Sequence, residues 1–502
     1  MFTLIPGKLT WDDIIKLQSN HLQLQLDENA IGNVNASSSW LEKQINSKRV
    51  MYGVNTGFGK LATTSISTAE LQVLQRKIIL SHAAGVGDYL ADDIVRLILL
   101  LKINSLARGY SGIKLTTIEA LIKLYNAGIY PCVPAQGSVG ASGDLAPLAH
   151  LSAVLIGEGY ARYQNNIVPA KEALTLIGMQ PLQLAAKEGL ALLNGTQVST
   201  ALALYALYLL EQNFYAAIIA GALSVDAARG SDEPFDARIQ SVRGHEGQIA
   251  VAKLFRQLLQ QSEIRASHNG CAKVQDPYCL RCQPQVMGAV LDLMQQAKHT
   301  LVQEANAVSD NPLIFHDDDC ILSGGNFHAE PVAFAADQLA LAVCEIGAIS
   351  ERRVALLMDP QFSQLPPFLV KESGINSGFM LAQVTSAALV SENKAMSHPA
   401  SVDSIPTSAN QEDHVSMATY AARRLLQMNE NLSNIIAIEL LTACQALDFL
   451  KPLKTSQSLQ GFYDTVRTQV PFYAEDRFFA PDILLVKHLI KQNAFKLGRV
   501  GN

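Results

Sequence analysis

The sequence predicts a mainly α-helical protein: an elongated bundle of long central helices with a smaller mixed N-terminal lobe. The first observation is helical apolar spacing sustained over four long stretches, residues 188–228, 285–309, 328–358 and 411–450. Patterns of this length are typical of coiled coils, membrane helices or elongated bundles. The second observation is composition, because 49% of the residues are hydrophobic and only 17% are charged, against a usual charged share of about 25%. A chain of 502 residues with this composition has a large interior to bury.

Residues 1–110 are expected to form the mixed N-terminal lobe, and residues 111–502 the helical bundle that carries most of the site. The first segment mixes short helical patterns with loop punctuation. Residues 48–52 predict a short strand that ends at Tyr52. Three glycines within residues 53–59 then predict a mobile loop directly after Tyr52.

The four long stretches differ in their surroundings and in how they end. Residues 188–228 are apolar almost all round, which predicts a helix in the middle of the bundle. Pro312 and Pro360 mark the ends of the stretches 285–309 and 328–358. Residues 411–450 contain no proline or glycine, and about 40 helical residues would span roughly 60 Å.

Charge and cysteine content exclude several classes of function. Lys and Arg number 39 against 45 Asp and Glu, for a net charge of -6, so no basic excess favours nucleic acid as a partner. Seven scattered cysteines give no disulfide framework, and a lone Cys279-x-x-Cys282 is a weak basis for a metal, so no metal site is expected. The longest apolar run, residues 198–210, is short of the roughly 20 residues that a membrane span needs. We therefore expect a cytoplasmic protein with no membrane contact.

The loop around Ala141-Ser142-Gly143 is the most unusual segment of the chain. Small residues precede a helix start at which Asp144 is the candidate N-cap. An ordinary glycine-rich turn would explain an isolated loop of this kind. A serine-hydrolase elbow is excluded, because Asp144 stands where G-x-S-x-G requires its second glycine. A third interpretation is self-cyclisation, in which the Gly143 nitrogen attacks the Ala141 carbonyl and two waters leave, so that Ser142 becomes a dehydroalanine.

This tripeptide, within the segment 137–150, resembles the signature of the aromatic amino acid ammonia-lyases. Members of that family build a 4-methylidene-imidazol-5-one (MIO) electrophile from the tripeptide, which implies a group formed here from Ala141, Ser142 and Gly143 with no external cofactor. The resemblance covers nearly the whole chain in order. Its further segments are 52–59, 81–87, 194–196, 275–284, 309–312, 324–328 and 411–414.

Within that family, Ser81-His82 together with Glu412 resembles the members that act on L-histidine. Members acting on phenylalanine or tyrosine tend to carry Phe-Leu or His-Leu at the pair and an amide in place of Glu412. An imidazole offers an N–H donor and a nitrogen acceptor, which a carboxylate and a histidine can both meet. The implied reaction converts L-histidine to trans-urocanate and ammonia. Another MIO enzyme, a phenylalanine or tyrosine lyase or an aminomutase, is the main alternative.

The resemblance also implies a role for each further site residue. Arg281 would clamp the substrate carboxylate, because its planar fork matches two oxygens. Asn194 would orient the MIO and the carboxylate, and His82 and Glu412 would hold the imidazole. The remaining implied site residues are Gln275 as a substrate-binding residue, Phe327 as a pocket wall, and Tyr52, Tyr278 or Glu412 as the base.

Each of these residues also has an ordinary structural explanation. Tyr52 alone would be a strand aromatic, His82 a helix-face histidine, and Glu412 a first-turn carboxylate, since residues 408–411 resemble a capping box. We expect Glu412 to play no part in cyclisation, because it lies far along the chain from Ser142. The alternative to an enzyme is a helical scaffold protein that keeps the fold but has no catalytic activity. The family further implies a homotetramer in which subunits share active sites.

Overall fold

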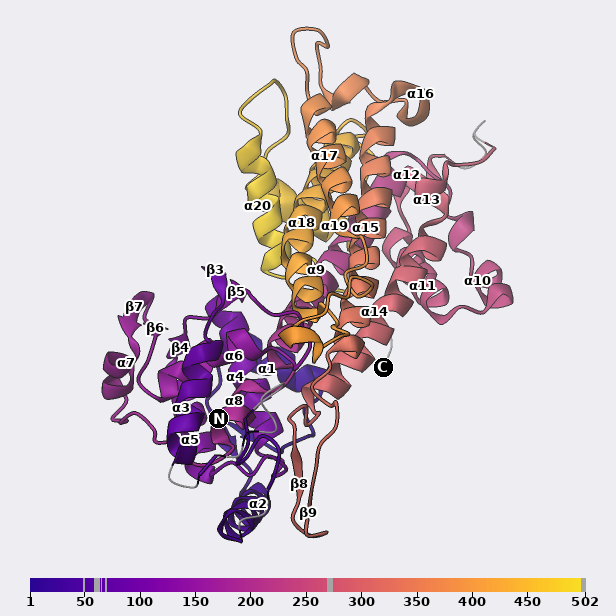
Figure 1. The fold of residues 1–502 in the computed structure, drawn as a ribbon. Helices are drawn as coiled ribbons and strands as arrows, with labels where there is room; N and C mark the ends of the chain where they lie inside the picture. The colour runs from indigo at the N-terminus through magenta and orange to yellow at the C-terminus, as the bar shows by residue number, and fades with distance from the viewer. Residues whose placement is uncertain (48–49, 58–63, 65, 68–69, 269–273, 498–502) are drawn as a thin grey trace. The chain divides into compact units, whose positions relative to one another are not determined.

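The computed structural model describes residues 1–47, 50–57, 64, 66–67, 70–268 and 274–497 (Figure 1). It is mainly α-helical with small sheets, which confirms the predicted fold class. The chain divides into two compact units. Unit 1 comprises Met1–Tyr205, Lys298–Asp337 and Pro399–Arg423, and unit 2 comprises Ala206–Ala297, Gln338–His398 and Arg424–Asn502. These units interleave along the chain, whereas the division into lobes 1–110 and 111–502 stays a prediction.

Unit 1 combines short strands with helices of modest length. Its strands are β1 (Phe2–Leu4), β2 (Leu24–Leu26), β3 (Val86–Tyr89), β4 (Tyr130–Pro131), β5 (Pro134–Gln136), β6 (Tyr160–Tyr163), β7 (Asn166–Pro169), β8 (Leu313–Phe315) and β9 (Cys320–Leu322). Its complete helices are α1 (Trp11–Asn20), α2 (Glu28–Asn46), α3 (Leu71–His82), α4 (Asp92–Leu106), α5 (Leu115–Ala127), α6 (Leu145–Leu155), α7 (Ala170–Leu176), α8 (Glu188–Leu193) and the 3-10 turn η5 (Ser408–Asn410). The strands pair as β1-β2 in parallel, and as β3-β5, β4-β6-β7 and β8-β9 in antiparallel.

In its described residues, unit 2 consists of helices and the loops that join them, and none of the named strands lies there. These helices are η3 (Glu233–Phe235), α10 (Ala237–Arg243), α11 (Glu246–Leu259), α12 (Glu263–Ala266), α13 (Tyr278–Arg281), α16 (Pro360–Ser363), η4 (Pro367–Leu369), α17 (Met380–Met396), α19 (Gln457–Gln469) and α20 (Ala480–Lys491). Four of the five unit boundaries fall inside long helices, which are α9 (Gln197–Ala227), α14 (Gln283–Ala305), α15 (Glu330–Met358) and α18 (Ala418–Asp448), and the fifth follows α17.

The four long helices match the four predicted stretches, with two corrections. The predicted helix 188–228 is broken at Asn194-Gly195-Thr196, between α8 and α9, because Gly195 takes a φ of +133°. The predicted helix 411–450 begins only at Ala418. Residues 408–410 all have positive φ, so the predicted capping box there is also wrong.

The prediction of a strand at residues 48–52 is wrong for residues 50–52, which the structure describes. Val50 and Met51 belong to no strand, and Tyr52 begins a turn. Residues 48, 49, 58 and 59 of that prediction lie outside the described residues.

The core of unit 1 lies around α4 and a group of three packed helices. All side chains from Ile94 to Leu106 in α4 are buried, and α3, α6 and α8 pack against one another. Because α6 and α8 end or begin next to the loops at Ser142 and Asn194, this packing holds both loops in place.

In unit 2, α9, α15 and α18 lie side by side around one buried carboxylate (Figure 1). Glu439 of α18 accepts hydrogen bonds from Ser224 of α9 (2.8 Å) and from Ser350 of α15 (2.5 Å). Arg353 of α15 donates to both oxygens of Glu439, and neither side chain is exposed to solvent. A buried charge is tolerated when it is paired and fully hydrogen-bonded, as it is here.

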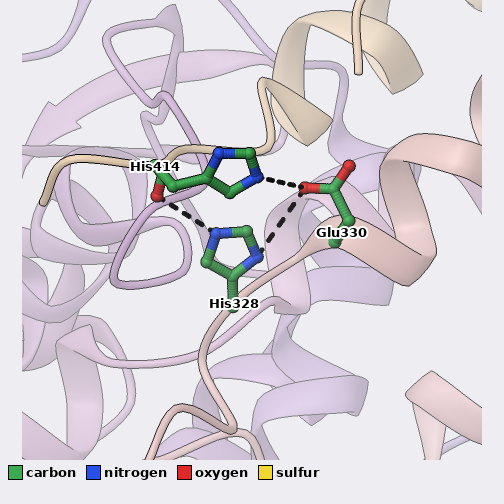
Figure 2. Close-up of side chains that lie close together, drawn as sticks. All are labelled: His328, Glu330 and His414. Carbon is green, nitrogen blue, oxygen red and sulfur yellow. Dashed lines mark hydrogen bonds and ion pairs between the residues drawn. The ribbon is translucent and has the colours of Figure 1, made fainter. Parts of the chain in front are cut away.

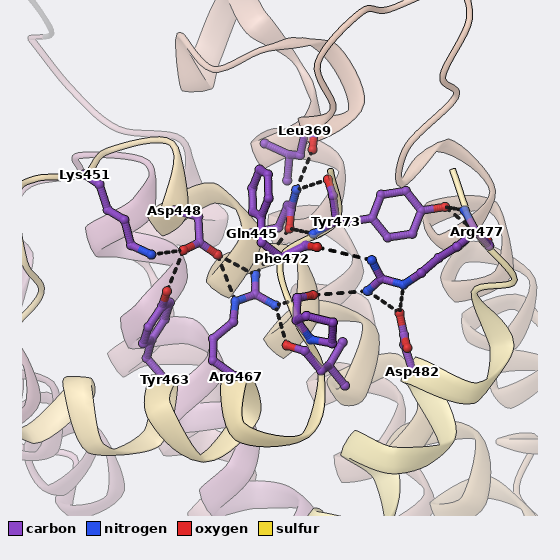
Figure 3. A network of polar contacts seen from close by, with 12 residues as sticks. Leu369, Gln445, Asp448, Lys451, Tyr463, Arg467, Phe472, Tyr473, Arg477 and Asp482 are labelled. Carbon is purple, nitrogen blue, oxygen red and sulfur yellow. Dashed lines mark hydrogen bonds and ion pairs between the residues drawn. The ribbon is translucent and has the colours of Figure 1, made fainter. Parts of the chain in front are cut away.

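A second polar network fastens the C-terminal part of unit 2 (Figure 3). Asp448, the last residue of α18, accepts from Tyr463 (2.5 Å) and from Arg467 Nε (2.8 Å), both on α19. Arg477 in turn pairs with Asp482 of α20 at 2.8 Å. The network therefore links α18, α19 and α20 through charged side chains.

Two helices of the described chain, α9 and α15, are long and apolar enough to span a membrane by length and composition alone. Their apolar windows are 72% and 61% buried inside the folded chain. Core helices pass the same test, and this burial is what a core helix requires.

We expect Arg353→Met to lower the free energy of unfolding by about 3–5 kcal/mol, because it leaves Glu439 buried without its cation. The matched control is Lys491→Met, which removes a cation from Glu430, a partly exposed carboxylate on the same helix α18. Exposed pairs contribute about 0–1 kcal/mol. Urea denaturation of both variants checks this expectation, and equal losses of stability would contradict it.

Candidate active site

A cavity of about 1040 Å³ in unit 1 is lined by seven of the predicted site residues. These residues come from separate loops and helix ends of the unit. They are Tyr52, His82, Ala141, Ser142, Asn194, Phe327 and Glu412. Gly143 directly follows Ser142, so the complete tripeptide lies at this cavity.

The tripeptide loop is held in a tight conformation by close backbone contacts. Gly143 has a φ of +70°, and a Cβ added there would lie 2.2 Å from the Gly195 carbonyl oxygen. That same oxygen accepts a hydrogen bond from the Asp144 nitrogen at 2.8 Å. On the other side, Ser416 Oγ donates to the Gly140 carbonyl at 3.0 Å. Glycine at position 143 is therefore required by space as well as by φ.

Asp144 occupies the N-cap position of α6, as predicted, but its side chain does not cap the helix. Its side chain makes no capping hydrogen bond to α6. The buried carboxylate instead accepts from Ser199 N at 2.7 Å in the first turn of α9, and from Thr419 Oγ1 at 2.6 Å and Ser138 Oγ at 3.1 Å. Burial raises the pKa of Asp144, and the hydrogen bonds from Ser199, Thr419 and Ser138 oppose that rise. The helix N-termini of α6 and α9 thus both lie next to the tripeptide loop.

The break between α8 and α9 directs Asn194 toward the tripeptide. Asn194 Nδ2 donates to the Ser142 carbonyl oxygen at 2.8 Å. The Asn194 carbonyl in turn accepts from Lys102 Nζ at 2.7 Å. Burial lowers the pKa of Lys102 to about 7. No motif pointed to Lys102, because its sequence neighbours form an ordinary apolar helix.

Glu412 contacts the tripeptide directly. Its distance along the chain from Ser142 is therefore no reason to exclude it from cyclisation, and that part of the prediction is wrong. Its Oε1 accepts a hydrogen bond from Ser142 Oγ at 2.7 Å. Its Oε2 accepts from Thr407 Oγ1 at 2.7 Å, and an antiparallel bridge joins the backbones of Thr407 and Glu412. This bridge fixes Glu412 in a loop before α18, where the carboxylate reaches the hydroxyl that cyclisation would remove.

His82 ends α3, and Phe327 lies in the loop between β9 and α15. His82 Nδ1 lies 2.8 Å from the Ile78 carbonyl and 3.1 Å from Ser81 Oγ. With its proton on Nδ1, the ring donates to Ile78 and leaves Nε2 as the remaining polar atom.

Three predicted site residues, Gln275, Tyr278 and Arg281, belong to unit 2 and do not line this cavity. Arg281 and Gln275 line a separate pocket of about 460 Å³. The Arg281 guanidinium lies 4.6 Å from the centre of the Tyr278 ring, and its Nε donates to the Asp276 carbonyl at 3.0 Å. The Tyr278 side chain is exposed. Within unit 1 the tripeptide cavity therefore lacks the predicted carboxylate clamp.

The structure also brings residues to the cavity that sequence reasoning missed. His328 and His414 both line it, beside Phe327 and Glu412. Two of the segments that resemble the lyase family, 324–328 and 411–414, end at these two histidines. Their shared place at the ends of these segments could have identified them from the sequence.

Comparison with known proteins identifies relatives over nearly the full chain. The family model described as aromatic amino acid lyase matches residues 9–468. The histidine ammonia-lyase of Salmonella typhimurium is 59% identical over 495 residues, which is 98% of this chain and 98% of that protein. The crystal structure of histidine ammonia-lyase from Trypanosoma cruzi has a TM-score of 0.91 at 41% identity, covering 99% of this chain and 94% of that one. Phenylalanine aminomutase from Pantoea agglomerans has a TM-score of 0.94 at 32% identity, covering 99% and 100%.

We expect Gly143→Ala to prevent cyclisation, because the added Cβ collides with the Gly195 carbonyl. Intact-mass spectrometry should then find the full sequence mass rather than a mass lower by two waters. The matched control is Gly178→Ala, which imposes a similar φ of +66° where a Cβ meets nothing within 4 Å. The control should lose two waters as wild type does, and a fully dehydrated Gly143→Ala protein would contradict the steric argument.

Proposed function

The chain belongs to the aromatic amino acid lyase family, and we propose that it removes ammonia from L-histidine to give trans-urocanate. This is a carbon–nitrogen bond cleavage without oxidation, and it is the first step of histidine breakdown. The observation that carries the proposal is the placement of Glu412 and His82 in one cavity with Ser142. The near-full-length identity to histidine ammonia-lyases supports the same substrate.

The tripeptide fits the MIO group that the family implies. Gly143 leaves room for the close approach of its nitrogen to the Ala141 carbonyl, and Ser142 supplies the departing hydroxyl. Gly143 packs against the Gly195 backbone, and Ser142 is hydrogen-bonded by Glu412 and Asn194. When formed, the MIO supplies an electrophile for the substrate amine, and so the electron sink that elimination of ammonia needs. No external cofactor is required by this proposal. Cyclisation releases two waters, from the Ser142 side chain and from the Ala141 carbonyl oxygen.

Glu412 and His82 give the cavity its preference for an imidazole. Glu412 can accept a hydrogen bond from a ring N–H, and His82 can meet the other ring nitrogen. A phenyl ring would leave both groups unpaired in the cavity, which costs about 1–3 kcal/mol for each buried group. A phenylalanine or tyrosine lyase or an aminomutase is not favoured for that reason.

Other residues of this chain bind, orient or move a proton. Asn194 holds the Ser142 carbonyl, and the positive ends of α6 and α9 favour negative charge at the loop. Phe327 forms an apolar wall of the cavity. Tyr52 and Glu412 are the candidate bases that line this cavity, and Tyr278 is the third candidate. A tyrosine ordinarily titrates near 10 and needs a nearby positive charge or dipole to act as a base.

We further propose a homotetramer in which subunits share active sites, with Tyr278, Arg281 and Gln275 completing the cavity of another subunit. Two observations support the assembly. Arg281, the predicted carboxylate clamp, lies in unit 2, and Lys77 is the lysine that lines the unit 1 cavity in its place among the described residues. Exposed apolar side chains also line the long helices of unit 2, among them Leu341 on α15 and Leu381 and Val384 on α17.

We also propose a cytoplasmic location. The six cysteines of the described residues are all free, which suits a reducing compartment.

We expect Glu412→Gln to lower kcat/KM for L-histidine by a factor of tens to thousands. Truncating one partner of a desolvated charged contact costs about 2–5 kcal/mol, and about 1.4 kcal/mol is tenfold. Because Glu412 also contacts Ser142, the rate is normalised to the fraction of chains that have lost two waters by mass. The matched control is Asp413→Asn, the same loss of charge one residue along, which should change the rate far less. Histidine turnover untouched by Glu412→Gln would contradict the substrate assignment.

The shared-site proposal is tested with hybrid tetramers made by co-expressing two inactive chains. A mixture of Ser142→Ala and Arg281→Met should regain about a quarter of wild-type activity, because random assembly leaves that share of sites with both residues intact. The control pair, Ser142→Ala with Tyr52→Phe, should regain none, since both residues line one cavity of one chain. No recovery in the first mixture would show that sites are not shared between Ser142 and Arg281.

A further inference from the structure

Three side chains that the proposed reaction does not use converge at the edge of the cavity (Figure 2). His328 precedes α15, Glu330 is the first residue of that helix, and His414 lies in the loop before α18. His328 Nδ1 and His414 Nε2 each lie 3.8 Å from Glu330 Oε2. All three atoms lie within 4.8 Å of one another, and the two imidazole rings are parallel within 10°.

The hydrogen bonding of this cluster fixes one imidazole tautomer and leaves a carboxylate oxygen facing two imidazole nitrogens. His328 Nε2 lies 3.2 Å from the His414 carbonyl oxygen, so it carries the proton and donates there. In the neutral tautomer with its proton on Nε2, the ring presents the lone pair of Nδ1 to Glu330. Glu330 Oε2 is itself buried and accepts no hydrogen bond from any donor of the described chain. A buried carboxylate oxygen between two imidazole nitrogens needs a positive charge to be stable.

A metal ion fits this arrangement better than a shared proton. A distance of 3.8 Å is longer than the 2.7–3.2 Å or so of an N–H···O hydrogen bond. Zinc bonds of about 2.0–2.2 Å at a tetrahedral angle place two ligand atoms about 3.4 Å apart. Closing the gap of each histidine–glutamate pair needs a shift of about 0.4 Å, and the two imidazole nitrogens, which lie within 4.8 Å of each other, need a shift of up to about 1.4 Å. The His414 side chain is 67% exposed and free to make this movement. A ligand histidine whose second nitrogen donates to a backbone carbonyl is also the usual outer-shell pattern.

We propose that His328, Glu330 and His414 bind a divalent transition metal ion of the Zn²⁺ type. Two imidazoles and one carboxylate suit such an ion, and three protein ligands leave a coordination position for water. His414 lies two residues from Glu412, so the ion fixes the loop that holds Glu412 against Ser142. The site is thus a positioning device beside the reaction centre. It does not depend on which amino acid is the substrate.

The test measures zinc bound at equilibrium by untagged protein, first stripped with a chelator and then dialysed against Zn²⁺. Wild type should bind about one ion per chain. His414→Gln and Glu330→Gln should each weaken binding at least tenfold, since loss even of an outer-shell partner costs about 10–100-fold. His414 is largely exposed, so its replacement keeps the fold even where Glu330→Gln does not. Replacing zinc by Co²⁺ should give visible absorption bands in wild type that are lost in His414→Gln.

The matched control is His316→Gln, a histidine 3.1 Å from the Asp317 carboxylate but outside the cavity. It should bind zinc as wild type does. Ser142→Ala, which cannot cyclise, should also bind zinc normally, so a failure of the proposed reaction would not be confused with a failure of the metal site. Zinc uptake that is absent in wild type, or that is equal in wild type, His414→Gln and His316→Gln, would overturn the proposal.

Discussion

The close approach of two glycines, Gly143 and Gly195, is the constraint on which the rest of the site depends. The backbone of Gly143 is so near the Gly195 carbonyl that no side chain fits between them. This contact joins the loop before α6 to the break before α9. Asn194 and Asp144 owe their positions to it, since each flanks one of the two glycines and bonds across to the other loop.

Around that contact, polar groups on the tripeptide are matched by partners from distant parts of the chain. Glu412 accepts from the Ser142 hydroxyl, and Asn194 donates to the Ser142 carbonyl. The same carboxylate that would recognise an imidazole thus touches the residue that would become the electrophile. One side chain can therefore serve both the maturation of the site and its choice of substrate. An amide at position 412 would therefore weaken recognition of the imidazole of histidine in particular.

Much of the fold could be predicted from the sequence, because apolar periodicity and proline punctuation mark long helices directly. Two breaks were not predicted. A lone glycine is often tolerated inside a helix, so Gly195 did not by itself show that the helix breaks there. Residues 411–417 contain no proline or glycine, so local propensity gave no sign that they lie outside the helix. The tripeptide was identified from its own residues and its resemblance. Partners such as Lys102, Thr407 and Thr419 were not, because each is an ordinary helix or loop residue until the fold brings it close. Arg281 shows the converse, because a motif gives a residue a role without saying which unit or subunit will supply it.

The central claim is that this cavity selects an imidazole for elimination of ammonia. The most direct measurement compares kcat/KM of the purified wild-type protein for L-histidine, L-phenylalanine and L-tyrosine, following the ultraviolet absorbance of the conjugated product. We predict trans-urocanate and ammonia in equal amounts from histidine, and at most a trace of product from the other two amino acids. Faster elimination from phenylalanine or tyrosine than from histidine would contradict it, even though the chain would remain a member of the same lyase family.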